Sequence, residues 1–186
     1  ELNNNPVIVT VNKFDEQSVN DFRNKVSMAH NTGQPVIPII IDSYGGQVYS
    51  LMAMIATIQQ CELPVATIVE GKAMSCGALL FSFGTEGMRY MDKDATVMIH
   101  DVSSGAWGKV EELKANADES VRLNKKVYRM MAKNIGKPEN YFIDKIHEKG
   151  HADWYLDANE CKDIGLANKL KIPKFDINLN VNILFD

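Results

Sequence analysis

Three polar residues at the ends of apolar segments have the side chains that nucleophilic chemistry requires. Ser75 lies among small residues between a strand-like run and an apolar helix-like run, where a nucleophile and a pocket for an oxyanion can coexist. His100 ends an apolar run and can serve as a general base at neutral pH. Asp153 precedes the bulky Trp154, which favours a partly buried, paired carboxylate. Each residue also has an ordinary interpretation, as a helix N-cap, a structural histidine and a loop aspartate.

A pair of glycines marks a second place where the backbone can contact a ligand. Gly45 and Gly46 lie between the buried run 36–41 and an apolar helical stripe, at the kind of turn where α/β sheets commonly build sites. Glycines let the backbone approach a ligand closely and direct N–H groups toward it. A tight structural turn would explain the same residues without any ligand. The sequence here matches neither a dinucleotide-binding nor a Walker motif, and Ser75 is not in a GxSxG elbow.

Alternating strands and helices must position these residues. Apolar and β-branched runs predict strands over residues 6–11, 36–41, 63–69, 88–91 and 95–99. Apolar residues at helical spacing predict a helix that opens at Asp15 and further helices over residues 48–58, 78–83 and 110–134. Asp157 and Glu160 form the pattern of a capping box, and Gly165 is placed to end that helix. This alternation predicts an α/β fold with a mostly parallel sheet.

Length and composition exclude several classes of protein. The 186 residues, 45% apolar and 24% charged, fit a single soluble domain over residues 1–186. A net charge of −4 leaves no basic excess for nucleic acid or for an anionic membrane surface. The three cysteines form no disulfide framework or zinc spacing, which favours a reducing compartment and hence the cytoplasm. No apolar run has the roughly 20 residues of a membrane span, and no cluster has the spacing of metal ligands.

Taken together, the four segments resemble the proteolytic subunit of the Clp proteases. In that family an Asn-Ser-Pro-Gly-Gly turn, an Ala-Ser-Met-Gly nucleophile, a Val-Met-Ile-His strand end and an Asp ahead of a Glu-Ala-x-x-x-Gly-Leu helix occur in this order. The matching segments here are Asp42-Ser43-Tyr44-Gly45-Gly46, Met74-Ser75-Cys76-Gly77, Val97-Met98-Ile99-His100, and Asp153 ahead of Glu160-Cys161-Lys162-Asp163-Ile164-Gly165-Leu166. The resemblance covers residues 7–170.

The resemblance implies a role for each of these residues. Ser75 would be the nucleophile, His100 the general base and Asp153 the group that orients the imidazole. The backbone N–H groups of Gly46 and Cys76 would form the oxyanion hole. Family members bind substrate as an added β-strand, and the matching positions are Gly45, Gln47, Val48, Ser103 and Ser104.

The resemblance also implies an architecture and partners. The family has a crotonase-like α/β fold of repeated ββα units, assembled into heptameric rings that commonly pair into a tetradecamer around a closed chamber. The long helix 110–134 corresponds to the element that interlocks the rings. An AAA+ unfoldase of the Clp type would deliver unfolded polypeptides and would consume the ATP. The chain itself would therefore need no cofactor and no metal.

Several positions depart from the family pattern. His151-Ala152 stands where the family has an Asp/Glu-Arg pair that senses ring contact, and Asp101 begins a segment that replaces Gln-Pro-x-Gly-Gly. Alternating apolar and polar residues predict a C-terminal strand within residues 171–186, beyond most relatives. This divergence is compatible with a phage-type variant, or with a catalytically impaired accessory subunit that assembles with an active paralogue. The sequence also leaves open a crotonase-type acyl-CoA enzyme and a peptidase that pairs Ser75 with Lys72.

Overall fold

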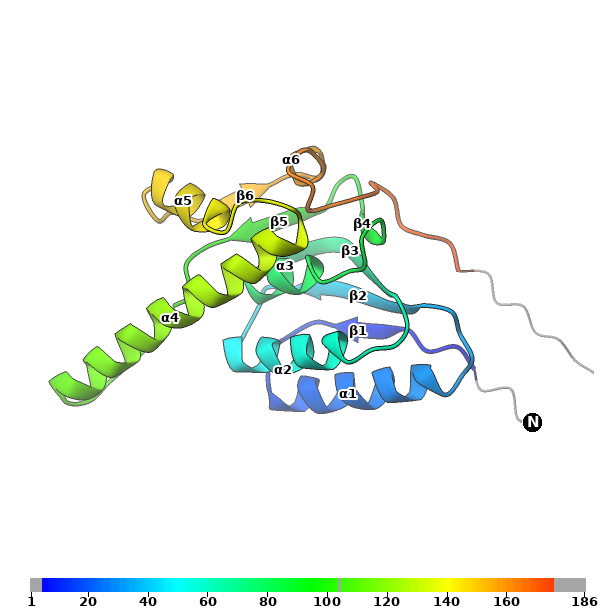
Figure 1. Ribbon diagram of the computed structural model, residues 1–186, viewed down its shortest axis with the longest axis horizontal. Helices are drawn as coiled ribbons and strands as arrows, with labels where there is room; N and C mark the ends of the chain where they lie inside the picture. The colour runs from blue at the N-terminus through cyan, green and yellow to red at the C-terminus, as the bar shows by residue number, and fades with distance from the viewer. Residues whose placement is uncertain (1–4, 104, 176–186) are drawn as a thin grey trace, which may run out of the picture.

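A six-stranded sheet forms the centre of the molecule in the computed structural model, which describes residues 5–103 and 105–175 (Figure 1). Five strands follow the order β1-β2-β3-β5-β6, and β4 pairs beside β5 on the same edge of β3. Every pair is parallel except β5 with β6. The predicted α/β fold with a mostly parallel sheet is therefore confirmed. The strands are Val9–Val11 (β1), Ile37–Ser43 (β2), Val65–Met74 (β3), Arg89–Met91 (β4), Thr96–Ile99 (β5) and Trp154–Leu156 (β6).

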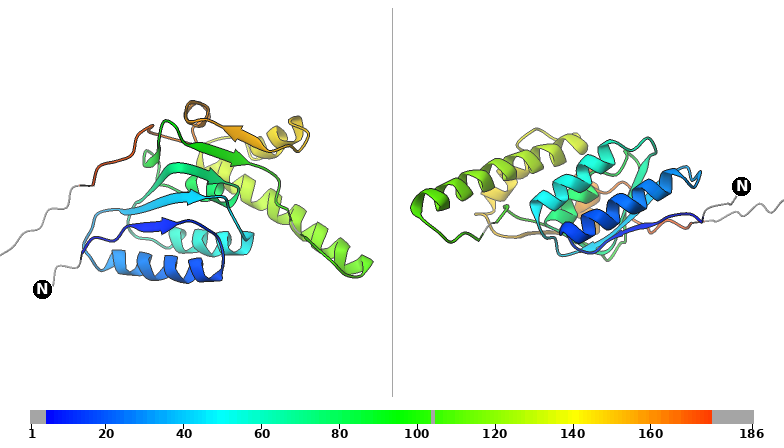
Figure 2. Two further views of the ribbon diagram at one scale, coloured as in Figure 1. Left: turned by 180° about the vertical axis from the view of Figure 1, so that it is seen from behind. Right: turned by 90° about the horizontal axis from the view of Figure 1, so that it is seen from below.

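Helices connect the strands and pack against the sheet. Helices α1 and α2 run side by side along it, and α3 follows directly on β3 (Figures 1 and 2). The third helix begins at Cys76, two residues before the predicted start, and α5 and β6 were not predicted at all. The helices are Glu16–His30 (α1), Val48–Gln59 (α2), Cys76–Phe81 (α3), Val110–Asn134 (α4), Tyr141–Glu148 (α5) and Ala158–Asp163 (α6).

The sequence patterns account for the central elements. Ile37, Ile39 and Ile41 of β2 are fully buried, because alternate residues of a strand share one face and this face belongs to the hydrophobic core. Ile40, on the opposite face, is only partly buried. Helix α1 begins with a capping box at Asp15. The Asp15 carboxylate accepts a hydrogen bond from the Ser18 backbone N–H at 2.8 Å, and the Ser18 hydroxyl accepts one from the Asp15 N–H at 2.9 Å. Asp157 caps α6 in the same way, as predicted.

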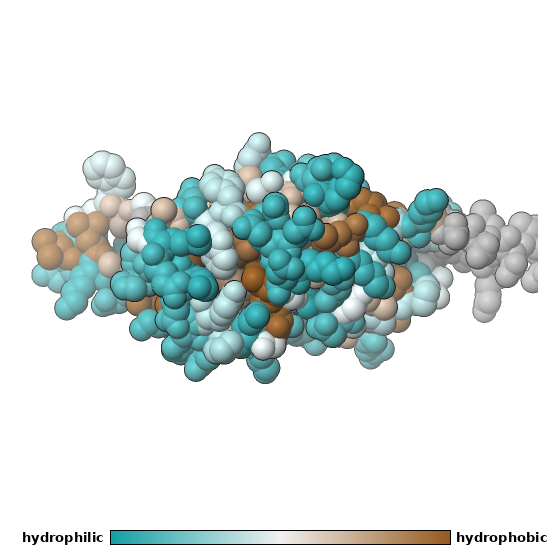
Figure 3. All heavy atoms as spheres, turned by 90° about the horizontal axis from the view of Figure 1, so that it is seen from above, coloured by the Kyte–Doolittle hydropathy of each residue, from teal (hydrophilic) through white to brown (hydrophobic). Residues whose placement is uncertain are grey.

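Helix α4 has the predicted bounds, but only its second half packs on the core. Its buried residues begin at Leu123, and its first half projects from the body of the molecule (Figures 1 and 2). Val110 and Leu113 near the projecting end are exposed, as is Trp107 just before the helix. Seen from above, apolar residues gather at this end (Figure 3). The long apolar stripe in the sequence is therefore divided between intramolecular packing and an uncovered surface.

The segment after α6 returns to the sheet. Lys169 forms an isolated parallel β-bridge with Tyr90 of β4, and residues 171–175 have no regular secondary structure. The rest of the predicted C-terminal strand, residues 176–186, lies outside the described residues. Within the described ranges, no helix is long and apolar enough to cross a membrane.

Candidate active site

Ser75 occupies the sharp turn between β3 and α3. Its backbone has φ of 55° and ψ of −117°, a left-handed conformation that a residue other than glycine rarely adopts. The Ser75 N–H donates to the Met98 carbonyl at 2.8 Å, so the turn is fixed to β5. Ser75 is the N-cap residue of α3, yet its side chain makes no capping hydrogen bond. The hydroxyl is therefore free to point elsewhere, and its strained backbone is typical of functional turns.

His100 contacts the Ser75 hydroxyl. The imidazole Nε2 lies 2.8 Å from the Ser75 Oγ, the separation expected of a nucleophile and its base. His100 directly follows β5, and the pairing of β5 with the end of β3 brings the two residues together. The Tyr128 hydroxyl of α4 donates to the His100 carbonyl and holds the backbone in place. Nothing in the sequence pattern indicates this contribution of Tyr128.

Asp153 lies on the other side of the imidazole. Its carboxylate oxygen is 3.6 Å from the His100 Nδ1, longer than a hydrogen bond but close enough for an ionic interaction. The antiparallel pairing of β5 with β6 places Ile99 opposite Trp154, so the residues just beyond each strand come together. The Asp153 side chain is about half exposed, at 52%. The structure thus brings together the three residues that the sequence singles out.

The glycine turn packs directly against Ser75. A β-carbon at Gly45 would lie 2.9 Å from the Ser75 Cβ and 3.1 Å from the Met74 carbonyl oxygen, and the φ of Gly45 is +110°. Gly46, with φ of +152°, has no space for a side chain because Phe14 passes alongside it. Both glycines are therefore required by the close approach of backbone to backbone.

Cys76 places a second backbone amide beside this turn. It is the first residue of α3, so its N–H has no acceptor within the helix. Its thiol lies 3.5 Å from the Gly46 carbonyl oxygen, which shows how close the two residues are. Burial raises the pKa of the Cys76 thiol to about 11, so the thiol stays protonated and does not compete with Ser75 as a nucleophile.

Lys72 has a different partner from the one a Ser–Lys mechanism requires. Its ammonium lies 2.8 Å from the Asp42 carboxylate and 4.5 Å from the centre of the Tyr44 ring. The hydrogen bond to Asp42 raises the pKa of Lys72, so the amine remains protonated. A general base must be deprotonated, and this environment opposes that.

The positions expected to bind substrate lie in different kinds of secondary structure. Gln47 is the N-cap of α2 and its N–H donates to the Phe14 carbonyl at 2.8 Å, while Val48 already belongs to the helix. The pairing of Gln47 and Val48 with a peptide strand stays a prediction, and the Gln47 N–H is already bound within the chain. Ser103 is exposed and lies in an irregular segment. Ser104 lies outside the described residues.

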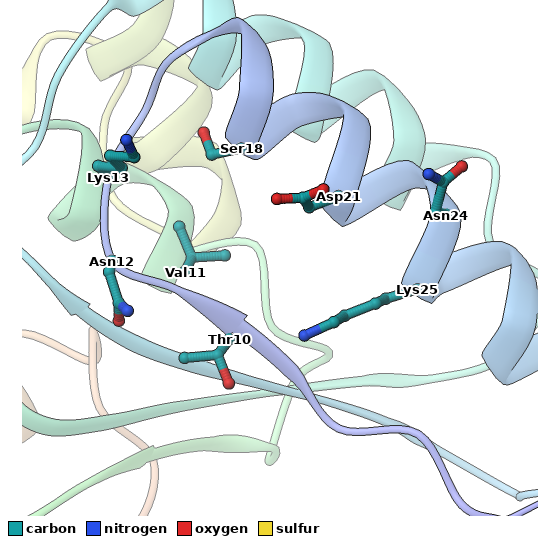
Figure 4. Close-up of a pocket in the computed structure, with 8 residues that line it drawn as sticks. All are labelled: Thr10, Val11, Asn12, Lys13, Ser18, Asp21, Asn24 and Lys25. Atoms are coloured by element: carbon teal, nitrogen blue, oxygen red, sulfur yellow. The ribbon is translucent and has the colours of Figure 1, made fainter.

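A separate cavity lies between β1 and α1. It has a volume of about 320 Å³ and is lined mainly by polar side chains, among them Thr10, Lys13, Asp21 and Lys25 (Figure 4). None of the residues singled out above lines it. Within the described ranges, no group of three or more histidine, cysteine or acidic residues has an arrangement that could hold a metal ion.

Comparison with known proteins agrees with this geometry. The family model for Clp protease matches residues 1–173. The matched range contains Ser75, His100, Asp153 and both glycines of the turn. It also contains the whole of the projecting helix.

Proposed function

This chain belongs to the Clp protease family, and from that premise we propose that it is a serine endopeptidase subunit that hydrolyses peptide bonds of unfolded polypeptides. The observation that carries the proposal is the 2.8 Å separation between the Ser75 Oγ and the His100 Nε2, at a turn packed against two glycines. A crotonase-type reaction on an acyl-CoA needs no such serine–imidazole pair, so this contact favours the peptidase.

The geometry supports a two-step acyl transfer. His100 accepts the Ser75 proton as the Oγ attacks the scissile carbonyl carbon, and it then donates that proton to the leaving amine. Asp153 orients the imidazole and stabilises its protonated form. The N–H groups of Gly46 and Cys76 would bind the oxyanion of each tetrahedral intermediate. His100 then accepts a proton from a water molecule as that water attacks the acyl-enzyme carbonyl, and it returns the proton to the Ser75 Oγ as the carboxylic acid product leaves.

We extend the proposal to assembly and location. The exposed apolar residues at the projecting end of α4, Trp107, Val110 and Leu113, are suited to contacts between copies of this chain in heptameric rings, single or paired. Such rings would enclose the sites in a chamber supplied by an AAA+ unfoldase of the Clp type, which consumes the ATP. The subunit would act in the cytoplasm without a cofactor of its own.

Labelling with a fluorophosphonate tests the activation of Ser75. We expect intact-mass analysis to show one adduct per chain in the wild type and none in Ser75→Ala, because only an activated serine reacts with this probe. Ser27→Ala, which alters an exposed serine on α1, serves as the matched control and should be labelled like the wild type. An unlabelled wild-type ring would contradict the proposal. If an active paralogue then restored peptide cleavage, the chain would be an accessory subunit.

Adding one methyl group at Gly45 tests whether the turn sets the position of Ser75. We expect Gly45→Ala to lower kcat/KM for a fluorogenic peptide at least ~100-fold, because its β-carbon would press on the Ser75 side chain. Gly33→Ala is the matched control, since Gly33 also has a positive φ, of +80°, but has nothing within 4 Å of the added carbon. Gly33→Ala should lose about 1 kcal/mol of stability, because it too places a β-carbon at a positive φ, but it should keep its activity. Equal activities in the two variants would refute the role of Gly45.

A further inference from the structure

A second histidine–aspartate pair lies next to the candidate triad. The Nδ1 of His151 is 2.6 Å from one carboxylate oxygen of Asp101. Asp101 directly follows His100, and His151 precedes Asp153 by two residues. The pair therefore links the two chain segments that carry the proposed base, His100, and the proposed orienting carboxylate, Asp153.

One end of this link is fixed to helix α4. The other carboxylate oxygen of Asp101 accepts a hydrogen bond from the Asn124 side-chain amide at 3.0 Å. The oxygen of the same amide accepts the Val102 N–H at 2.8 Å, and the Tyr128 hydroxyl donates to the His100 carbonyl. Residues 100–102 are thus held by two successive turns of α4. The side chain of Asp153, by contrast, is half exposed.

From these contacts we propose that Asp101 and His151 are a positioning pair that holds Asp153 against the His100 imidazole. The 3.6 Å separation between Asp153 and His100 is too long for a strong hydrogen bond, so that contact does not fix the distance by itself. The shorter 2.6 Å contact of the pair fixes it instead. This inference rests on the proposed function, because it concerns the orientation of the proposed base.

The backbone of His151 lies in the left-handed region, with a φ of +62°, which histidine and asparagine adopt more readily than most residues with a β-carbon. The titratable groups in contact with its ring are Asp101, from the segment after β5, and His147 of α5, whose Nδ1 lies 3.3 Å from the His151 Nε2. From α4 the pair receives the neutral amide of Asn124. A carboxylate only accepts, so the His151 Nδ1 donates to Asp101.

The test measures the rate of fluorophosphonate labelling of Ser75 in the assembled wild type and in His151→Ala at one fixed pH. We expect the rate to fall about tenfold in His151→Ala, because the imidazole of His100 loses its fixed orientation.

Two further variants keep the test decisive. His151→Asn retains an N–H donor near the Nδ1 position and tolerates the positive φ, so it should recover most of the labelling rate. His30→Ala, on α1, is the matched histidine control and should behave as the wild type. An unchanged labelling rate in His151→Ala, or a failure of His151→Asn to recover the rate, would overturn the pair while labelling of the wild type still supported the proposed function. An unlabelled wild type would overturn both.

Discussion

Replacing His100 with alanine is expected to lower kcat for a fluorogenic peptide about 10⁴-fold, with KM nearly unchanged. The loss corresponds to about 5.5 kcal/mol of transition-state stabilisation. It arises because, among the described residues, no other base contacts the Ser75 Oγ: the imidazole Nε2 lies 2.8 Å away, while Lys72 is bound to Asp42. KM should change little, because the imidazole acts on the proton of Ser75 and does not form the surface that holds the peptide. Steady-state kinetics on the assembled protein measure both constants.

Non-additivity gives this prediction a sharper form. If Ser75 and His100 act as one unit, the double variant Ser75→Ala with His100→Ala should be no slower than either single variant. In the wild type the His30 imidazole bonds to the Val26 carbonyl on α1. The variant His30→Ala therefore controls for the loss of a histidine outside the proposed site. Independent, multiplying losses in the double variant would show that the two residues do not share a mechanism. A His100→Ala variant within tenfold of the wild type would remove His100 from the proposed site.

Ser75, His100 and the glycine turn could be predicted because they stand at the ends of long apolar runs. The carboxyl ends of neighbouring parallel strands meet at one edge of a sheet, so residues that follow β2, β3 and β5 must come close together. The apolar pattern predicted where these residues lie in the fold, whereas their roles followed from the resemblance to the Clp protease family.

The position of Asp153 depends on an element that the pattern did not indicate. Strand β6 has three residues, Trp154–Leu156, too few for alternation to be recognised, and it runs antiparallel to β5. Only the register of this pair places Asp153 beside His100. The contacts of Asp101 with His151 were missed for the same reason, because they join two loops whose approach is fixed by β6. Sequence spacing carries no information about such contacts.

Arg89 is a buried charged residue that the hydropathy pattern of the sequence does not reveal. It lies in β4, within an apolar run that predicts a strand, and its side chain is only 2% exposed. The guanidinium donates to the carbonyls of Leu166 at 2.9 Å, Gly165 at 3.0 Å and Gly84 at 3.2 Å. Its salt bridge with Glu86 reaches an exposed carboxylate. The cost of burying this charge is thus offset by backbone carbonyls, two from the segment after α6 and one from the turn before β4, which hydropathy cannot reveal.

Arg89→Met is therefore expected to lower the free energy of unfolding by about 3–5 kcal/mol, because it leaves up to three carbonyls without their donor. Urea unfolding at one fixed protein concentration measures the change, since assembly adds to apparent stability. Arg129→Met is the matched control: Arg129 is 42% exposed and pairs with Glu139 at the surface, so its loss should cost at most ~1 kcal/mol. Similar losses in the two variants would mean that Arg89 does not anchor the segment after α6. Because none of these contacts lies at Ser75, the folded fraction of Arg89→Met should keep the wild-type rate of serine labelling.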